Sequence, residues 1–590
     1  MLPEKDIALR QREGERIARL NAHSKETLRV GVLSTFNVGL IEPFLHERLS
    51  QNGEIPRFYM GPFGQVSQEL LNPESALHHF QPNVVIVLTA AQDLLAPIFH
   101  LERMDDGGRK AYVENCISDL RSALLVLVRE QPGAVCYLSC INTCEAPIPN
   151  VLDPSSALRG QRILQQLLTE FTALSSLSPR IVNVDWNWDT TPGGTDLYDD
   201  DRLWYLARMR LNLRGLAQFS QLFYRHYCAY RGTSRKVLVT DLDGTLWGGV
   251  VGEAGLQGIV LGGDGIGLAF QDVQRAMLAY LESGVLLAIC SKNNPADVLD
   301  VFEKHSGMVL RKSHFAGTRI NWKDKTQNLR DLADELNVDL DSFVFIDDNP
   351  AERDLVRTLM PEVLVPELPV DPVQRPRFLR KLTCFDRIAV TKEDRVRVDS
   401  YGQQAQRMEL KSTSKSFEQF LASLQQVVSI EPVHSGTVAR AAQLCQRTNQ
   451  FNLTTKRYTL GDLENFSSNK ILELYTLRAR DRYGDNGVVG FAMLRFVGDV
   501  AEIDTLLMSC RALGRKLEDV FLSFLAQRAR DRGARCLEGH YQATAKNSQA
   551  AKFYQERSFV PEDDNVFVLD LTKYTPLIIP EVSLEVMTIA

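Results

Sequence analysis

The sequence predicts an α/β protein with three domains in one chain. Short β-branched runs, such as residues 84–88 and 237–240, alternate with stretches that have the pattern of amphipathic helices. This alternation is typical of doubly wound sheets that carry helices on both faces. The chain has 590 residues, which is well beyond the roughly 250–300 at which a single hydrophobic core stops growing.

The domain boundaries are placed where the pattern of strands and helices changes. The predicted segments are an N-terminal helix at 1–27, an α/β domain at 28–232, a central parallel-sheet domain without a large cap at 233–380, a charged helical linker at 381–426, a mixed α/β domain at 427–575 and a tail at 576–590.

Composition and charge exclude several classes of protein. A hydrophobic fraction of 44% and a charged fraction of 24% are ordinary for a globular chain. The net charge of −7, without a long basic block, gives no reason to expect nucleic acid. No apolar run approaches the ~20 residues that span a bilayer, and the first residues lack the apolar core of a signal peptide. We therefore expect a soluble, cytoplasmic protein with no membrane partner.

The chain contains ten cysteines, which we expect to be mostly free and buried, as is usual in the cytosol. Cys136, Cys140 and Cys144 recur every fourth residue and could indicate a metal site. No histidine lies nearby, and residues 134–141 have the pattern of a strand, so core packing is the favoured interpretation.

The first α/β domain is predicted from strands at 28–33, 84–88, 134–141 and 180–184, with helices at about 41–52, 110–130 and 157–175. Ser34 directly follows the first strand, which resembles the SGNH hydrolases, and residues 61–65 could add backbone donors. That family also has an Asp-x-x-His tetrapeptide, which is missing here, and a serine without a base is a weak nucleophile. We expect an SGNH-like fold that is not a hydrolase and that serves as a docking domain.

Two carboxylates follow the buried strand of the central domain. Asp241 and Asp243 lie two residues apart in an extended chain, so their side chains leave the same face. A cation is the usual reason to hold two carboxylates together, because their repulsion otherwise raises one pKa. Gly244 permits the sharp turn that follows. The alternative is a solvated Asp-Gly turn at a strand end.

Three further motifs follow in order. Ser291 ends a strand at about 285–289, and a helix starting near residue 295 adds amide donors for an anion. Lys325 lies at the start of a helix, and Lys323 is the alternative lysine. The buried strand beginning at residue 343 delivers Asp347 and Asp348. The nine glycines between 248 and 267 predict loops and hairpins.

Together these motifs resemble the haloacid dehalogenase (HAD) superfamily of phosphoryl-transfer proteins. The resemblance implies Mg²⁺ held by carboxylates and a backbone carbonyl, with lysine and serine orienting the phosphoryl oxygens. Only short segments separate the motifs, so no sizeable cap fits and the site is expected to be open. An open site suits a large substrate such as the pantetheine arm of a carrier protein.

The C-terminal domain resembles the GNAT acyltransferases. Strands at 471–478, 488–496 and 500–507 precede a helix at about 516–532, and a later helix carries Phe553 and Tyr554. In this family a loop of the form Arg/Gln-x-x-Gly-x-Gly/Ala holds pyrophosphate on backbone amides. Arg511 and Gly514 fit this pattern, but Arg515-Lys516 follows, so the chain lacks the small residue that ends the loop. The residues expected to bind a carrier's pantetheine arm are Arg511, Gly514, Arg515, Asn547 and Tyr554.

Longer strings narrow the resemblance to the FkbH-like family of HAD proteins, over about residues 235–575. These strings lie at 241–253, 290–294, 320–325, 345–350, 448–455 and 509–515. The resemblance implies a glyceryl transferase/phosphatase that takes D-1,3-bisphosphoglycerate, removes both phosphates and leaves a glyceryl thioester on an acyl carrier protein for polyketide-type biosynthesis. No carrier serine motif is evident, so the carrier is expected to be a separate polypeptide.

The resemblance also implies residue roles. Asp241 would attack the 3-phosphoryl group, Asp243 would act as general acid and then base, and the metal set would be Asp241, Asp243, Asp347 and Asp348. Cys290, beside Lys292 and a helix N-terminus, is the candidate acceptor thiol for the glyceryl group. The competing interpretation makes Cys290 a buried strand residue, because Ser291 must face the site.

Two other functions stay open. A phosphatase of another small metabolite needs only the central motifs. A GNAT-type acyltransferase would use CoA or carrier-bound acyl groups and would not need Mg²⁺. A docking protein without activity would require all the acidic motifs to be inert.

Overall fold

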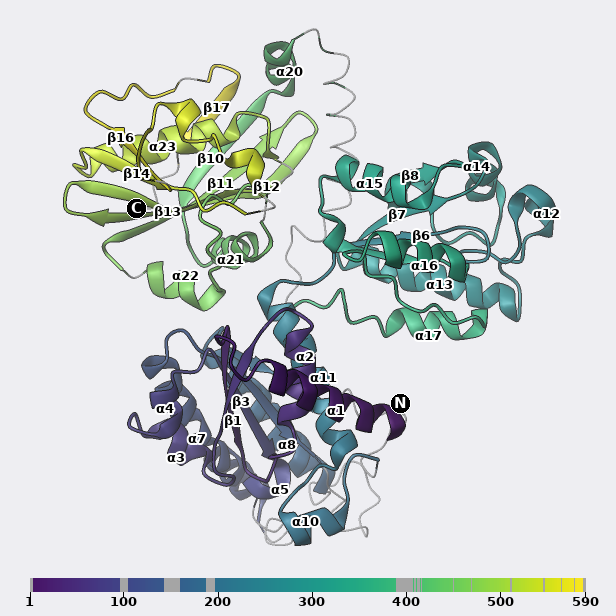
Figure 1. Cartoon of the computed structure of the whole chain (residues 1–590), viewed down its shortest axis with the longest axis vertical. Coiled ribbons are helices and arrows are strands. Elements are labelled where there is room, and N and C mark those ends of the chain that lie inside the picture. The colour runs from purple at the N-terminus through teal and green to yellow at the C-terminus, as the bar shows by residue number, and fades with distance from the viewer. Residues whose placement is uncertain are drawn as a thin grey trace. The chain divides into compact units, whose positions relative to one another are not determined.

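The structure is a computed structural model whose chain divides into two compact units, Met1–Cys228 and Ala229–Ala590 (Figure 1). It describes residues 4–95, 104–142, 160–186, 197–388, 407, 410, 414, 416–448, 450–467, 469–509, 512–544, 547–563, 565–577 and 579–586. Two sheets are parallel and a third, of eight strands, is mixed. The predicted multi-domain α/β class is therefore confirmed.

The first unit contains a five-stranded parallel sheet in the order β2-β1-β3-β4-β5. Its strands are β1 Leu28–Ser34, β2 Pro56–Met60, β3 Val84–Ala90, β4 Val135–Ile141 and β5 Ile181–Asn183. Its helices are α1 Glu4–Leu20, α2 Glu42–Ser50, α3 Val66–Leu71, α4 Ala76–Phe80, α5 Ala91–Leu94, α7 Asp106–Glu130, α8 Gly160–Ala173 and α10 Asp201–Ala207, with α11 Leu213–Arg231 at the boundary.

Helices cover both faces of this sheet, as expected for a doubly wound fold. Leucines and valines of β1, β3 and β4 pack with α3, α7 and α8 on one face. On the other face Tyr137 of β4 meets Phe223 of α11 edge to face, with ring centroids 5.0 Å apart. The sequence did not predict β2, an edge strand whose residues after Pro56 are partly exposed.

The second unit begins with a four-stranded parallel sheet in the order β8-β7-β6-β9. Its strands are β6 Val237–Thr240, β7 Leu286–Ser291, β8 Phe315–Ile320 and β9 Phe343–Ile346. Its helices are α12 Val251–Gly258, α13 Ile266–Glu282, α14 Pro295–Lys304, α15 Lys325–Leu336, α16 Pro350–Leu359 and α17 Arg375–Arg380.

Alternate residues of these strands enter two separate cores. Leu238, Leu287 and Ile346 pack with α13, α14 and α17. Val239, Ala288 and Phe345 pack with α15 and α16 on the opposite face. Because both faces are covered, the strands are continuous apolar runs, which is the pattern that made them predictable.

The glycine-rich segment after β6 differs from the prediction. It was expected to form only loops, yet it contains α12, which is interrupted at Gly255 with φ +66°. The edge strand β8 was also missed, because Gly317 and partly exposed residues give it no clear alternation.

The mixed sheet that follows has the order β15-β16-β14-β13-β12-β11-β10-β17. Its strands are β10 Gln426–Pro432, β11 Leu472–Asp481, β12 Gly484–Val497, β13 Val500–Met508, β14 Cys536–His540, β15 Val560–Asp563, β16 Val566–Asp570 and β17 Val582–Val586. Its helices are α20 Phe417–Leu424, α21 Val438–Arg447, α22 Leu460–Ser467 and α23 Leu517–Asp531.

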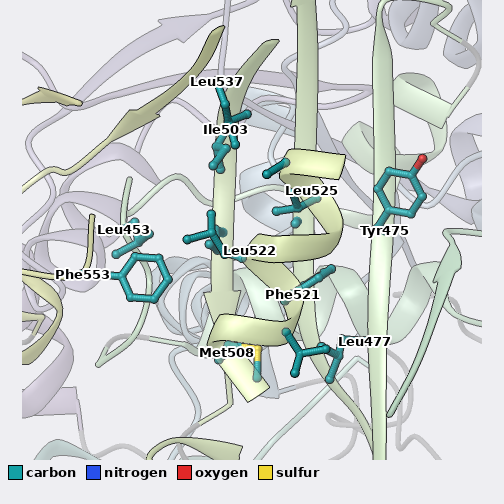
Figure 2. Packing of buried hydrophobic residues seen from close by; sticks show 14 of the residues in the cluster. Leu453, Tyr475, Leu477, Ile503, Met508, Phe521, Leu522, Leu525, Leu537 and Phe553 are labelled. Atoms are coloured by element: carbon teal, nitrogen blue, oxygen red, sulfur yellow. The ribbon is translucent and has the colours of Figure 1, made fainter. Parts of the chain in front are cut away.

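The larger core of this sheet lies under α23. Figure 2 shows Phe521, Leu522 and Leu525 of α23 facing the strands, among Ile503 and Met508 of β13 and their neighbours. Helices α21 and α22 cover a second apolar cluster on the other face. The domain therefore has helices on both sides of one sheet.

Two predictions for the C-terminal part are wrong. Tyr554 does not lie on an α-helix: its surroundings are the 3₁₀ turns Ser548–Ala550 and Gln555–Arg557. The expected tail contains β17, which pairs in parallel with β10. Of the predicted helical linker, α20 is described, whereas residues 389–406 lie outside the described part.

Within the described segments, no helix is both long enough and apolar enough to span a bilayer.

Candidate active site

The site lies at the carboxyl edge of the β8-β7-β6-β9 sheet. Asp241 follows β6, Ser291 ends β7, Lys325 begins the helix after β8, and Asp347 follows β9. Because parallel strands end at the same edge, side chains that are far apart in the sequence meet there. The four predicted motifs are thus brought together by the strand order alone.

Three carboxylates form the acidic part of this site. Oxygen atoms of Asp241, Asp347 and Asp348 all lie within 4.8 Å of one another. Asp241 is 7% exposed and Asp347 is fully buried. Like charges this close repel, and burial adds a desolvation cost, so the group needs positive charge nearby.

Lys325 supplies part of that charge. Its Nζ donates to Asp241 Oδ1 at 2.9 Å and to Asp347 Oδ2 at 2.5 Å, and the residue is 3% exposed. Burial by itself lowers the pKa of Lys325, but attraction from both carboxylates outweighs it, so the pKa is raised and the ammonium stays charged. Lys323, the alternative from the sequence, is exposed on the preceding loop.

The carboxylates at this site carry more negative charge than the neighbouring side chains compensate. Burial raises the pKa of Asp241, and the neighbouring Asp347 adds to the effect, while Lys325 and a hydrogen bond from Ser291 oppose it. Burial and Asp347 likewise raise the pKa of Asp348. When ionised, the three carboxylates outnumber the positive groups that act on them, Lys325 and, at Asp348, Arg375, so a net negative charge remains for a cation to offset.

Asp243 has different surroundings. Its Oδ1 accepts hydrogen bonds from Trp247 Nε1 at 2.7 Å and from the Val251 amide at 3.1 Å, and its Oδ2 accepts one from Asn293 Nδ2 at 2.7 Å. The structure does not bring this carboxylate into the group formed by Asp241, Asp347 and Asp348. Three donors fix its orientation instead.

The turn after Asp243 requires a glycine at position 244. Gly244 has φ +69°, and a Cβ placed there would lie 2.2 Å from Asp348 Oδ2. The Asp348 amide donates to Thr245 Oγ1 at 3.1 Å, which ties the ends of β6 and β9 together. A side chain at position 244 would therefore displace Asp348.

Two buried arginines support these loops, and the sequence analysis missed both. Arg353 Nη1 donates to the carbonyls of Asp347 and Asp348 at 2.8 and 2.9 Å. Arg375 donates to the Gly244 carbonyl and, through Nε, to the Pro369 carbonyl at 2.8 Å. No local pattern marks Arg375 for the site, because its partner there, Gly244, is 131 residues away in the sequence.

Cys290 does not lie where an acceptor thiol should be. It is fully buried, it packs with Val239 and Phe345 under α15, and its thiol points to the Lys325 carbonyl at 3.8 Å. Burial raises the pKa of the Cys290 thiol to about 12. Neighbouring strand residues face opposite sides, so with Ser291 turned to the site the structure favours the buried-residue interpretation over the predicted catalytic role.

Of the predicted carrier-binding residues, Arg515, Asn547 and Tyr554 are buried and have structural contacts. Arg511 lies outside the described residues. Gly514 has φ +69° with open space around it. Arg515 is 4% exposed and its Nη1 pairs with Asp481 at 2.8 Å. Arg407, from the predicted linker, pairs with the same buried carboxylate at 2.8 Å.

Asn547 closes a loop. It is fully buried, and its Nδ2 donates to the carbonyls of Asn452 at 3.0 Å and Gln542 at 2.9 Å. Its Oδ1 accepts from the Thr544 amide at 2.8 Å. Tyr554 is also buried at 1% exposure, and its ring lies against Gly539, where a Cβ would be 2.5 Å away.

The gap between β13 and β14 is filled by the chain itself. These strands pair only from Val500 to Ile503 of β13. Beyond that point the Leu453 amide donates to the Leu506 carbonyl at 3.2 Å, and the Gln542 amide donates to the Leu453 carbonyl at 2.8 Å. Residues 451–453 therefore hydrogen-bond to both sides of the gap, and Asn452 forms an isolated β-bridge with Leu507 of β13.

In the first domain, Ser34 is buried, and its hydroxyl accepts a hydrogen bond from the Phe36 amide at 3.2 Å. The adjacent Thr35 hydroxyl donates to Asp93 at 2.8 Å, and Asp93 pairs with Arg210 at 2.6 Å. The absence of hydrolase activity in this domain stays a prediction.

Fold and site together define a class of protein: an α/β chain whose parallel sheet gathers carboxylates, a lysine and a serine at its carboxyl edge. A solved structure of this kind that the chain resembles is the N-terminal part of the protein BF1531 from Bacteroides fragilis, containing a phosphatase domain complexed with Mg. The sequences are 26% identical, the TM-score is 0.56, and the likeness covers 64% of this chain and 99% of that chain. It supports a phosphatase-type domain here.

Shorter likenesses involve acetyltransferases. The ribosomal-protein-S18-alanine N-acetyltransferase from Escherichia coli is 15% identical, with a TM-score of 0.20 over 26% of this chain and 99% of that chain. A spermidine N-acetyltransferase from Vibrio cholerae, in complex with CoA and spermine, is 12% identical, with a TM-score of 0.21 over 25% of this chain and 96% of that chain. Scores this low carry no argument. No family model matches the chain, and no curated protein does.

Proposed function

We propose that this chain is a Mg²⁺-dependent glyceryl transferase/phosphatase of the FkbH-like kind. It would convert D-1,3-bisphosphoglycerate to a glyceryl thioester on a separate acyl carrier protein, for polyketide-type biosynthesis. The observation that carries the proposal is the buried Lys325 between Asp241 and Asp347, with Asp348 and Ser291 at the same sheet edge. The likeness to a Mg-containing phosphatase domain supports it.

The donor set fits the cation. Mg²⁺ prefers hard oxygen ligands and is usually held by one or two carboxylates together with substrate phosphate. Asp241, Asp347 and Asp348 offer such oxygens within 4.8 Å of one another, with an excess of negative charge. When bound, the cation would neutralise phosphoryl oxygens and so stabilise the charge that develops on them.

Asp241 is the proposed nucleophile. Its carboxylate would attack the 3-phosphoryl phosphorus, the glyceryl oxygen would leave, and water would then hydrolyse the aspartyl phosphate. Lys325 and Ser291 both donate hydrogen bonds to Asp241, so they fix the attacking oxygens and can also contact phosphoryl oxygens.

Asp243 is the proposed general acid and base. It would protonate the leaving glyceryl oxygen and then take a proton from the hydrolytic water. Trp247, Val251 and Asn293 hold its carboxylate in one orientation. These contacts position the group without tying it to the acidic cluster.

The acyl-transfer step does not need Cys290. The thiol of the carrier's pantetheine arm can attack the C1 carbonyl of the acyl phosphate directly, forming the thioester and releasing the 1-phosphate. The buried position of Cys290 supports this direct route. A Cys290→Ala chain is expected to form glyceryl-carrier at the normal rate, and a loss of thioester with normal folding would restore the acceptor role.

One experiment tests the whole proposal. The protein is incubated with Mg²⁺, a system that generates D-1,3-bisphosphoglycerate, and candidate holo-carriers, and the mass of each carrier is measured. A gain equal to one glyceryl group, with release of both phosphates, is expected. Asp241→Asn should stop release of the 3-phosphate, so continued release would contradict the nucleophile assignment.

A plain phosphatase is the first alternative, because the site geometry is equally compatible with another small phosphorylated metabolite. It would release phosphate without any carrier. A GNAT-type acyltransferase is less compatible with the structure, because residues 451–453 occupy the gap between β13 and β14, where an extended ligand could otherwise pair with the strand edges. A lack of acetyl transfer from acetyl-CoA would agree with this.

A further inference from the structure

A tryptophan stands exposed beside the active site. Trp322 lies in the loop between β8 and α15, three residues before Lys325, and it is 71% exposed. The loop runs close to the phosphoryl-binding serine, since the Asn321 amide donates to the Ser291 carbonyl at 3.2 Å. The indole therefore lies at the rim of the carboxyl edge.

The ring is exposed but held in place. Trp322 Nε1 donates to Asn294 Oδ1 at 3.2 Å, which connects the loop after β8 to the loop after β7. Asn294 is itself held by Asp297 at 3.2 Å. An aromatic side chain with a fixed polar end and a free face loses little conformational freedom when a ligand packs on it.

The loop that carries Trp322 is also braced from within. The side chains of Asn321 and Asn328 exchange two hydrogen bonds of 3.2 and 3.0 Å, and the Lys323 amide donates to Asn321 Oδ1 at 2.9 Å. The exposed ring is thus presented by a rigid loop. A fixed, exposed aromatic face at the rim of the carboxyl edge is a surface on which a ligand can pack.

Lys323 adds a charge at the same place. It is exposed, and none of the described acidic side chains lies within ion-pair distance of its Nζ. An aromatic face followed by an unpaired ammonium suits a ligand that is flat or aliphatic along its length and carries a negative charge. A phosphopantetheine arm has this chemistry, with amides along its length and a phosphate at one end.

We propose that Trp322 and Lys323 form a rim site for the phosphopantetheine arm of the carrier, with the indole packing on the amide-bearing part and Lys323 pairing with the phosphate. This inference rests on the proposed function, which requires such an arm to reach the site. The described residues between β6 and β9 form no separate cap domain, so these segments leave the strand ends open to an arm from solvent.

The probe for the test is 4′-phosphopantetheine, titrated into the full chain by calorimetry and compared with pantetheine, which lacks the phosphate. Trp322→Ala is expected to weaken binding of both compounds by about tenfold, the size of an aromatic packing contribution. Trp322→Phe should restore most of the loss. Lys323→Gln should weaken binding of 4′-phosphopantetheine by up to about fivefold and leave pantetheine unaffected.

Leu359→Ala is the matched control. Leu359 is 54% exposed and ends α16, which begins at the carboxyl edge, so the residue lies toward the opposite edge of the same sheet. It should bind both probes as the parent chain does. Far-ultraviolet circular dichroism of each variant shows whether the fold is kept.

Three results would overturn the rim site: no binding of either probe to the parent chain, equal binding by a folded Trp322→Ala chain, or an equal loss in Leu359→Ala. Coenzyme A and a holo-carrier, tested in parallel, separate a free arm from one presented by a protein. A chain that binds the arm but releases no phosphate would contradict the proposed function and leave the rim site supported. Asp241→Asn should retain arm binding while losing phosphate release.

Discussion

At the scale of single residues, the site depends on how Lys325 compensates buried negative charge. Its ammonium bridges Asp241 and Asp347 with almost no access to solvent. An oriented positive group in such surroundings stabilises developing phosphoryl charge far better than a solvated one does.

Lys325→Met is therefore expected to lower the rate of phosphate release by about 100- to 1,000-fold, the usual cost of removing one such oriented group. The rate is measured with excess Mg²⁺, so that weaker cation binding does not hide the effect. Lys304→Gln, which removes a lysine 57% exposed in an i,i+4 pair with Asp300, is the control and should keep the parent rate. A Lys325→Met chain with a tenth of normal activity would contradict the assignment.

Alanine variants at Gly244 and Gly249 distinguish the effect of backbone strain from the effect of a steric collision. Both have positive φ, at +69° and +89°, so alanine at either position costs about 1–2 kcal/mol of stability. Only at Gly244 would the new Cβ collide with Asp348 Oδ2. Gly244→Ala should therefore also lose cation affinity, measured from the free Mn²⁺ signal in electron paramagnetic resonance. Gly249→Ala should keep it, and equal affinities in the two variants would refute the steric account.

The acidic residues of this site could be predicted from the sequence because each follows a buried strand, and parallel strands end at one edge. Arg353, Arg375 and Asn293 could not be predicted, since their roles depend on loops brought together only in the folded chain. For Cys290 the sequence left two interpretations, and strand alternation, seen in its packing under α15, favours the structural one.

At the scale of secondary-structure elements, an ion triad joins distant parts of the C-terminal domain. Asp481 at the end of β11 pairs with both Arg407 and Arg515, and all three side chains are at most 5% exposed. Burial alone raises the pKa of Asp481, but the two arginines outweigh burial and hold the pKa below its ordinary value. The ionised Asp481 carboxylate therefore contributes its full stabilisation at pH values above the ordinary pKa. This stabilisation is lost as the pH falls through the lowered pKa of the folded chain.

Asp481→Asn should destabilise this domain by about 3–5 kcal/mol, because it removes the buried carboxylate that two guanidinium groups share. Urea unfolding followed by circular dichroism measures the change, and the loss should shrink as the pH falls below about 4. Lys573→Gln removes an exposed partner of Asp570 in the same domain and should cost less than about 1 kcal/mol. Similar losses in the two variants would contradict this account.

The strand β4, which is a continuous apolar run, and the long helices α7 and α23 were predicted to within a few residues. The elements that were missed have three different physical causes. The edge strands β2 and β8 are half exposed and show no clear alternation of apolar and polar residues. Tyr554 is buried between two short 3₁₀ turns, although the sequence pattern there predicts an α-helix. The isolated β-bridge between Asn452 and Leu507 depends entirely on tertiary partners.

At the scale of the whole molecule, cation binding should stabilise the protein as well as activate it. A ligand that binds only the folded chain adds about 2.7 kcal/mol when its concentration is a hundred times its dissociation constant. Removal of Mg²⁺ with EDTA should abolish phosphate release and lower the midpoint of the central domain's thermal unfolding, and excess Mg²⁺ should restore both. Asp347→Asn should show no such shift. A shift of normal size in that variant would mean that Mg²⁺ binds elsewhere.

The last strand has a practical consequence for handling the protein. Val582–Val586 covers the outer edge of β10 along five paired residues. Without β17, β10 would present a row of unpaired amides and carbonyls that can pair with a strand of another chain. A shortened version that stops before residue 579 should therefore precipitate or form aggregates during purification, and expression designs for crystallography should keep these residues intact.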